Sequence, residues 1–283
     1  MRIGCHLTIT KGLDKAAAFA AGIGANTFQY FTRNPRGGAA RRIGPEEIGR
    51  WRRSREEHDI YPVVGHLPYT VNLAATGGRP GDFAAMVVEE DLQRVGELEG
   101  EILVSHPGHY EADRETALRQ ITSLLEKSLE LDVPNRPVLC LETMALQSRE
   151  IGSLEDLGYI LRALGFPAAL GVCLDSAHLF AAGWDLRTRA GCDRLVDRLE
   201  AEVGLERVKC MHLNDSLVPM GSRKDRHAVL GRGELGETGI SAIIVHPFLG
   251  RLPLLLETPV DKYEDYGPQL AFARSLVGEG SLA

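Results

Sequence analysis

Six short apolar runs in the chain each end at a histidine, an aspartate or a glutamate. The residues at these ends are His66, His106, Glu142, Asp175, His212 and Glu257. The steps from one to the next are 40, 36, 33, 37 and 45 residues. One buried strand, its helix and two short loops take about that length, so the spacing is typical of successive units in a parallel α/β fold.

Two further strand candidates precede these runs, at residues 3–6 and 28–31, which makes eight strands. Helical patterns lie between most of them, at residues 13–21, 45–58, 116–131, 153–164, 192–203, 240–248 and 263–277. This alternation predicts a (β/α)₈ TIM barrel, and 283 residues suit one such domain spanning 1–283. Because the carboxyl ends of all strands meet at one mouth of a barrel, the six polar residues should lie together there.

Strand alternation also predicts the layer beneath that mouth. Side chains two positions before each polar residue point the same way as it does. These positions hold Val64, Val104, Cys140, Cys173, Cys210 and Leu255. All are apolar and of small or medium size, so we expect them to fill the barrel interior, with the cysteines acting as core side chains.

Three more residues extend the polar set. His178 lies three residues after Asp175, and the spacing of Asp225 and His227 places both on one side of an extended segment. Each of these residues alone has a simpler explanation, such as a hydrogen-bonded strand end, an arginine pair or a solvated loop. The recurrence at barrel spacing instead favours a metal site. Histidine with carboxylate and no thiolate suits Zn²⁺ or Mn²⁺, and nine ligands suffice for two or three ions.

Composition restricts the cellular compartment and the binding partners that we expect. The net charge of −7 argues weakly against a nucleic-acid partner, but three divalent ions would add +6 inside the cleft. Five cysteines without a CxxC pair favour a reduced cytoplasmic setting. No run approaches the length of a membrane span, and a strand candidate near the N-terminus leaves no room for a signal peptide. Since no heptad pattern is visible, we expect a monomer.

Several segments resemble one known family closely. They are His106-Pro107-Gly108, Cys173 to His178, Ala181 to Asp185, His212 to Ser216, Gly221 to His227 and Glu257-Thr258-Pro259. On these motifs, which are spread between Ile3 and Pro259, the chain resembles the endonuclease IV family of zinc-dependent apurinic/apyrimidinic endonucleases. The resemblance implies a xylose-isomerase-like TIM barrel, three zinc ions, damaged duplex DNA as partner and a role in base excision repair.

The resemblance also implies roles for single residues. His66 and His106 would bind a first zinc, and Glu142 would bridge it to a second as the central catalytic carboxylate. Asp175, His212 and Glu257 would complete the second site. His178, Asp225 and His227 would bind the third ion. A metal hydroxide would then attack in line at the phosphodiester 5′ of an abasic site, leaving a 3′-hydroxyl and a 5′-deoxyribose phosphate.

Residues at the mouth of the barrel are expected to contact DNA. The loop after the second strand contains Asn34 and Arg36, and Arg36 resembles the arginine that the family inserts into the minor groove. Tyr69 resembles the aromatic residue that stacks into the gap, and Arg41-Arg42 is an alternative wedge. Two positions differ from the best-known form of the family, which has larger apolar side chains where this chain has Gly38 and Thr70. His6 and His109 match histidines near the family site.

Two other functions remain open from the sequence. A metal-dependent sugar isomerase or epimerase with a xylose-isomerase-like barrel would use similar strand-end ligands around one or two ions. Asp225 and His227, and the pair His66 and His106, would then have no role. A non-catalytic binder of damaged DNA would bind abasic duplex without cutting it. Metal content separates the first alternative from the nuclease, and a strand-cleavage assay separates the second.

Overall fold

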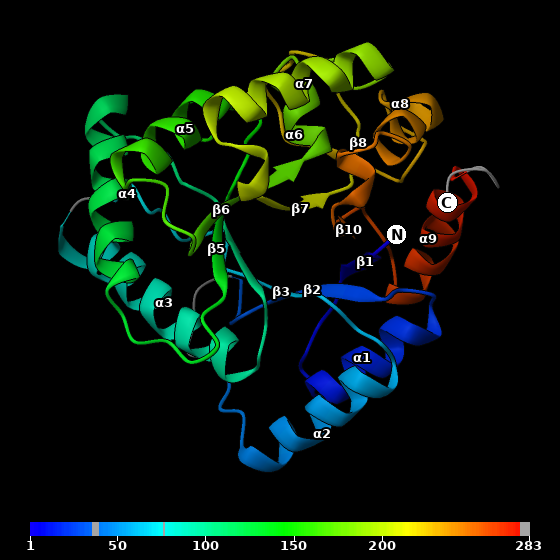
Figure 1. Cartoon of the computed structure of the whole chain (residues 1–283), viewed down its shortest axis with the longest axis horizontal. Helices are drawn as coiled ribbons and strands as arrows, with labels where there is room; N and C mark the ends of the chain where they lie inside the picture. The colour runs from blue at the N-terminus through cyan, green and yellow to red at the C-terminus, as the bar shows by residue number, and fades with distance from the viewer. Residues whose placement is uncertain (36–39, 76, 278–283) are drawn as a thin grey trace.

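The computed structural model describes residues 1–35, 40–75 and 77–277, and a closed barrel of eight parallel strands forms its centre (Figure 1). Around the barrel the strands are β1 (Ile3–His6), β2 (Thr27–Phe31), β3 (Val63–His66), β4 (Ile102–Ser105), β5 (Val138–Glu142), β6 (Leu170–Asp175), β7 (Val208–His212) and β10 (Leu254–Leu256). β10 pairs with β1 and closes the ring. The predicted TIM barrel is therefore confirmed.

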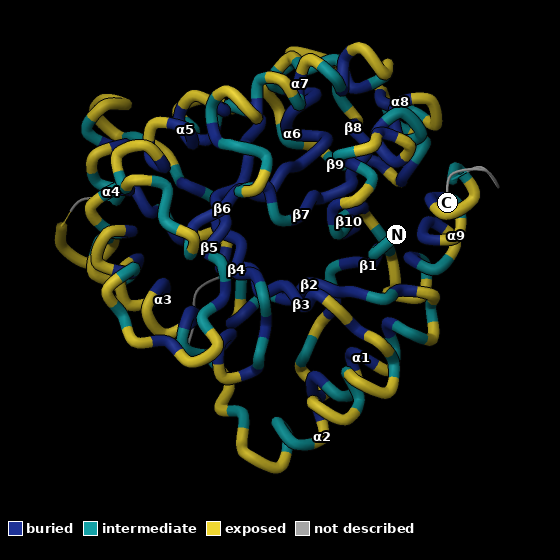
Figure 2. Tube along the Cα trace, in the orientation of Figure 1, coloured by how far each residue is buried: buried dark blue, intermediate teal, exposed yellow. Residues whose placement is uncertain are grey.

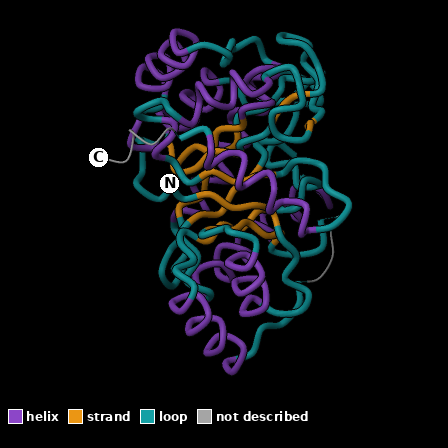
Figure 3. The backbone as a smooth tube through the Cα atoms, turned by 90° about the vertical axis from the view of Figure 1, so that its right-hand side faces the viewer, coloured by secondary structure: helices purple, strands orange, loops and turns teal. Residues whose placement is uncertain are grey.

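Helices surround this barrel on the outside (Figures 1 and 3). They are α1 (Leu13–Gly22), α2 (Pro45–Glu57), α3 (Gly78–Glu97), α4 (Arg114–Leu129), α5 (Leu154–Ala163), α6 (Ser176–Ala181), α7 (Arg189–Glu202), α8 (Gly236–Ile244) and α9 (Tyr266–Ser275). A small antiparallel pair, β8 (Asp215–Ser216) and β9 (His227–Ala228), follows β7. Among the described residues, none of these helices is long and apolar enough to cross a membrane.

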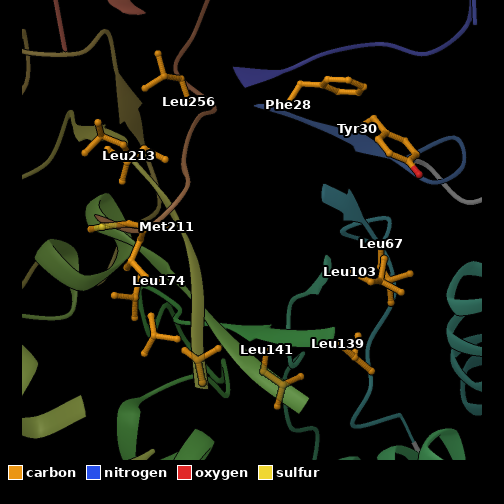
Figure 4. Packing of buried hydrophobic residues seen from close by; sticks show 14 of the residues in the cluster. Phe28, Tyr30, Leu67, Leu103, Leu139, Leu141, Leu174, Met211, Leu213 and Leu256 are labelled. Atoms are coloured by element: carbon orange, nitrogen blue, oxygen red, sulfur yellow. The ribbon is translucent and has the colours of Figure 1, made fainter. Parts of the chain in front are cut away.

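The strands separate two apolar layers. Outward-facing side chains such as Phe28 and Tyr30 project from one side of β2 and belong to the larger core between barrel and helices (Figure 4). The inward-facing cluster is Val64, Ile102, Val104, Cys140, Cys173, Cys210 and Leu255, all at most 5% exposed. This cluster contains all six residues predicted for the layer beneath the mouth. Figure 2 shows the resulting arrangement of a buried barrel with helices exposed on their outer faces.

Three helices differ most from the sequence prediction, and the short helix α6, directly after β6, was not predicted. No helix was predicted between β3 and β4, where α3 spans 20 residues. Pro80 and three glycines weaken its start and end signals, but Ala84, Val87, Val88, Leu92 and Val95 form a buried face at helical spacing. Helix α8 begins at Gly236 rather than at residue 240. Its first turn is stabilised by a residue about twenty positions earlier in the sequence. The buried carboxylate of Asp215 accepts hydrogen bonds from the backbone N–H groups of Leu235 and Gly236.

An irregularity between β6 and β7 shapes the mouth of the barrel. The register shifts between Val172 and Cys173, and beyond this point Asp175 lies opposite His212. On the neighbouring pair of strands, Glu142 lies opposite Cys173. The strand ends therefore bring polar residues from β5, β6 and β7 to adjacent positions directly above the cysteines.

Candidate metal centre

The six strand-end residues lie together at the mouth of the barrel. Glu142, Asp175 and His212 are the last residues of their strands, as is His66, while His106 and Glu257 lie one residue beyond theirs. A cavity of about 770 Å³ opens above them. Most of the predicted ligands line this cavity, whereas Asp175 and His212 are completely buried beneath it. Strand register thus fixes the position of each side chain within a shared space.

Three residues form a first group whose candidate ligand atoms all lie within 4.8 Å of one another: His66, His106 and Glu142. The Nε2 atoms of the two histidines lie 3.2 and 3.4 Å from Oε2 of Glu142. The two rings approach edge to face, with centroids 5.3 Å apart. This is the set that the resemblance implies for the first ion.

A second group consists of Glu142, Asp175, His212 and Glu257, again with ligand atoms within 4.8 Å. Nδ1 of His212 lies at its centre, 3.1 Å from Oε1 of Glu142 and 3.2 Å from Oε2 of Glu257. The Oδ2 atom of Asp175 is 3.8 Å from the same nitrogen. Glu142 therefore presents one carboxylate oxygen to each of two groups, which is the arrangement a bridging ligand requires.

The third group contains Asp175, His178 and His227. His178 lies in α6, where the Asp175 carboxylate accepts its backbone N–H, and His227 begins β9. Asp225 completes the group, because its two oxygens lie 3.4 Å from His178 Nε2 and 3.2 Å from His227 Nε2. Asp175 was predicted for the second site alone, and the structure places it at the third as well.

Hydrogen bonds on the outer side of the rings determine which nitrogen faces each group. Nδ1 of His66 contacts the backbone oxygen of Leu67, Nδ1 of His178 that of Thr143, and Nδ1 of His227 that of Glu257. A carbonyl oxygen only accepts, so each Nδ1 carries a hydrogen, and in the neutral ring Nε2 is the nitrogen that presents a lone pair inward. The Nε2 atoms of His178 and His227 are buried, and although both lie near Asp225, neither makes a hydrogen bond to any described residue.

The electrostatics of the centre fit bound cations. Burial would lower the pKa of His212, but the carboxylates of Glu257 and Glu142 outweigh it and raise the pKa to about 10. Burial would raise the pKa of Glu142, but His212 and His106 hold it well below its ordinary value. Four carboxylates thus surround inward-facing imidazoles, two of which have orphaned nitrogens. Protons on the histidines partly offset this negative charge, and divalent ions such as Zn²⁺ or Mn²⁺ suit the same donor set.

The residues expected to contact DNA lie at different places, and some of them lie outside the described residues. Tyr69 lines the cavity beside His66, the residue is 53% exposed, and its ring lies edge to face with Phe31, with centroids 6.2 Å apart. Asn34 lies in the loop after β2, next to a smaller cavity of about 590 Å³. Arg36 and Gly38 lie outside the described residues. His6 lines the main cavity beside Glu257, whereas His109 contacts Asn72 on the rim.

Two residues that hold the predicted ligands were not recognised in the sequence. The amide of Asn214 donates to Asp175 Oδ2 at 2.7 Å and accepts the backbone N–H of Glu257 at 2.8 Å. Gln29, in β2, contacts both His212 and Glu257. Both are polar residues in otherwise buried segments, which is the sequence signal that would have identified them.

Comparisons with known proteins bear on the fold and the family of the chain. Residues 17–276 match a family described as xylose isomerase-like TIM barrel. The chain is 58% identical to a probable endonuclease 4 of Moorella thermoacetica, covering 98% of this chain and 99% of that one. Endonuclease IV from Thermus thermophilus superposes with a TM-score of 0.85 at 33% identity, covering 98% of both chains. A D-tagatose 3-epimerase-like protein, with a TM-score of 0.69 at 16% identity over 96% of each chain, shares the fold alone.

Proposed function

The chain belongs to the endonuclease IV family, and we propose that it is a DNA-repair endonuclease that cuts the phosphodiester 5′ of abasic sites in duplex DNA. The observation that carries this proposal is the grouping of nine metal-type side chains into three overlapping sets that share Glu142 and Asp175. A fourth set, His66, His212 and Glu257, draws its members from the first two. Three sets suit three ions, chiefly zinc, with manganese as an alternative at some sites.

The floor of the cavity would hold the metals in the following way. His66, His106 and Glu142 bind one ion, Glu142, Asp175, His212 and Glu257 the next, and Asp175, His178, Asp225 and His227 the last. When bound, these ions supply positive charge to the phosphate and lower the pKa of a coordinated water towards about 7. The protein holds their ligands rigidly, since Asp175 and His212 are fully buried and Asn214 ties Asp175 to the strand end of Glu257.

The rim of the cavity would recognise the damaged nucleotide. An abasic sugar has no base to stack or pair, so rotating it out of the duplex costs little. The cavity of about 770 Å³ has space for such a sugar and its phosphate, with Lys262 at its wall. Tyr69 offers an exposed ring for stacking in the gap, and we assign Asn34 and Arg36 to the minor-groove side. The products would be a 3′-hydroxyl and a 5′-deoxyribose phosphate, with no covalent enzyme intermediate.

Sugar epimerisation would leave part of this centre without a role. One or two ions would be held mainly by Glu142, Asp175, His212 and Glu257. The pair His66 and His106 and the pair Asp225 and His227 would then have no ion to bind. The likeness to the epimerase-like protein concerns the barrel, at 16% identity. We therefore propose the nuclease, and we propose that it acts as a monomer in a reducing cytoplasm, where its five buried cysteines remain thiols.

A nicking assay tests the proposal. The substrate is a duplex carrying one tetrahydrofuran site, labelled at the 5′ end, with an intact duplex of the same sequence as control. We expect one cut 5′ of the tetrahydrofuran, a product end that a polymerase extends, and loss of cutting after incubation with a chelator. Binding to the damaged duplex without cutting, in the presence of zinc, would contradict the nuclease and support a damage-binding protein.

A further inference from the structure

Gln29 is a fully buried amide in the middle of β2. Its neighbours Phe28 and Tyr30 project from the outer side of the strand, so Gln29 points into the barrel (Figure 4). In the sheet it lies opposite His6 of β1 and Val64 of β3. A glutamine at this depth needs hydrogen-bond partners for both ends of its amide.

The partners of Gln29 fix the orientation of that amide. Its Nε2 donates to Oε1 of Glu257 at 2.7 Å, and it lies 3.0 Å from Nδ1 of His6. Its Oε1 lies 2.8 Å from Nε2 of His212. An ionised carboxylate only accepts hydrogen bonds, so the NH₂ group must face Glu257 and the oxygen must face His212. Nε2 of His212 therefore carries the hydrogen.

This arrangement sets which nitrogen of His212 faces the centre. When a bound metal ion displaces the proton of Nδ1, the remaining hydrogen stays on Nε2, and the lone pair of Nδ1 faces the space between Glu142, Asp175 and Glu257. His212 differs here from His66, His178 and His227, whose outer nitrogens contact backbone carbonyls. Since its partner is a side chain, the effect of that partner on His212 is open to mutation.

We propose that Gln29 is a positioning residue that fixes the tautomer and ring orientation of His212 and holds Glu257, so that both face the second metal ion. The proposal rests on the proposed metal centre and deepens it. Partners of this kind typically change metal affinity by about 10- to 100-fold. We expect Gln29→Leu to weaken binding of one zinc ion by about that factor, because His212 and Glu257 both lose a hydrogen bond.

Two further variants make the test specific. Thr27→Val is the matched control, since Thr27 is also buried, lies two residues earlier on the same strand and donates to the backbone oxygen of Pro62, away from the ligands. It should leave zinc affinity unchanged. Gln29→Glu keeps an acceptor for His212 but places a second acceptor against Glu257. It should retain the His212 tautomer and still bind the ion more weakly.

The readouts are zinc affinity, measured by competition with a chromophoric chelator, and the histidine ring ¹⁵N–¹H spectrum of the zinc-loaded protein. A slowly exchanging Nε2–H signal of His212 should be present in the wild type and in Gln29→Glu, and it should be lost or exchange rapidly in Gln29→Leu. The proposal is overturned if Gln29→Leu keeps this signal and binds zinc within about twofold of the wild type.

Other outcomes are equally decisive. If Gln29→Leu does not fold, Gln29→Glu decides. The proposal is overturned if Gln29→Glu loses the His212 signal, or if it binds zinc with the same affinity as the wild type. If Thr27→Val weakens zinc binding as much as Gln29→Leu, a general loss of packing explains the effect and the proposal is wrong. A wild type that binds zinc but does not nick abasic DNA contradicts the proposed function alone, because zinc affinity and the ring signals are measured without DNA.

Discussion

The floor and the rim of the cavity are built in different ways. The floor consists of the nine proposed metal ligands, six of which follow directly from strand ends, and His212 and Asp175 there are completely buried. The described part of the rim consists of Asn34, Tyr69 and Thr70, which lie on the loops after β2 and β3. Strand register and hydrogen bonds fix the floor, whereas the Tyr69 side chain is half-exposed and touches Phe31 edge to face.

This difference suggests that the floor binds metal ions and that the rim contacts DNA. Most side chains that must contact metal ions are held by rigid strands, and side chains that contact a deformable duplex are carried by loops. Changes at the floor should therefore alter metal content and the chemical step together. Changes at the rim should alter discrimination for abasic DNA while metal content stays the same.

The largest expected effect is at the shared floor residue. Glu142→Gln removes the charge and one good acceptor from a side chain whose two oxygens face different groups. We expect incision to fall by more than about 100-fold, with loss of bound metal. Affinity for duplex DNA should partly persist, because phosphate contacts elsewhere on the mouth remain. A Glu142→Gln protein that nicks abasic duplex at near wild-type rate would show that Glu142 is not the bridge.

Acidification should act on the floor through its histidines. His212 has its pKa raised to about 10 by the neighbouring carboxylates, so a metal ion must displace a proton from it at neutral pH. Zinc affinity should therefore fall with decreasing pH, by up to about tenfold per unit for each proton displaced. Dialysis at a series of pH values, followed by elemental analysis, measures this, and zinc content that is constant down to pH 5 contradicts it.

The metal-free protein should show the opposite trend in stability. A histidine whose folded pKa lies above its unfolded value of 6.5 stabilises the folded state fully below that value. This stabilisation is lost as the pH rises through the folded pKa of about 10. Urea unfolding of chelator-treated protein should thus give a midpoint that falls between pH 7 and pH 10. A midpoint that rises over this window would show that His212 is not protonated in the metal-free fold.

A smaller effect is expected at the rim. Arg36→Ala or Tyr69→Ala should weaken incision of abasic duplex by at least about tenfold, or roughly 1.4 kcal/mol, because stacking and groove contacts in the gap are lost. Metal content should not change. Single-turnover kinetics on matched abasic and intact duplexes measure the effect. Should both variants cut as fast as the parent, other residues form the wedge, and the Arg41-Arg42 pair is the next to test.

The smallest effect should come from enlarging the rim. Thr70 is exposed beside Tyr69, and its hydroxyl makes one long contact of 3.5 Å with the backbone oxygen of Pro35. Thr70→Leu adds apolar surface at the gap, and we expect it to tighten binding to abasic duplex by about two- to fivefold, less than a full aromatic stack would give. Equal affinities of variant and parent for tetrahydrofuran duplex would mean that this side chain does not enter the gap.

The sequence was most informative in the strands, where the same alternation of side chains predicts both the core residues and the residues of the site. The apolar runs located His66, His106 and their counterparts, and alternation by two located the cysteine layer beneath them. Roles that depend on contacts between distant segments were less visible. Nothing in the strand containing Gln29 indicates that its partners lie on β7 and after β10, and the start of α8 depends on Asp215, about twenty residues earlier. The wedge loop was inferred from resemblance alone, and Arg36 lies outside the described residues.

A zinc titration of nicking activity tests the central claim most directly. Chelator-stripped protein is given increasing equivalents of zinc, and bound metal and incision of a tetrahydrofuran duplex are measured on the same samples. The three groups on the floor predict that incision is absent without metal and reaches its plateau only as bound zinc approaches three ions per chain. Full incision in the stripped protein, or a plateau at one bound ion, would contradict the account.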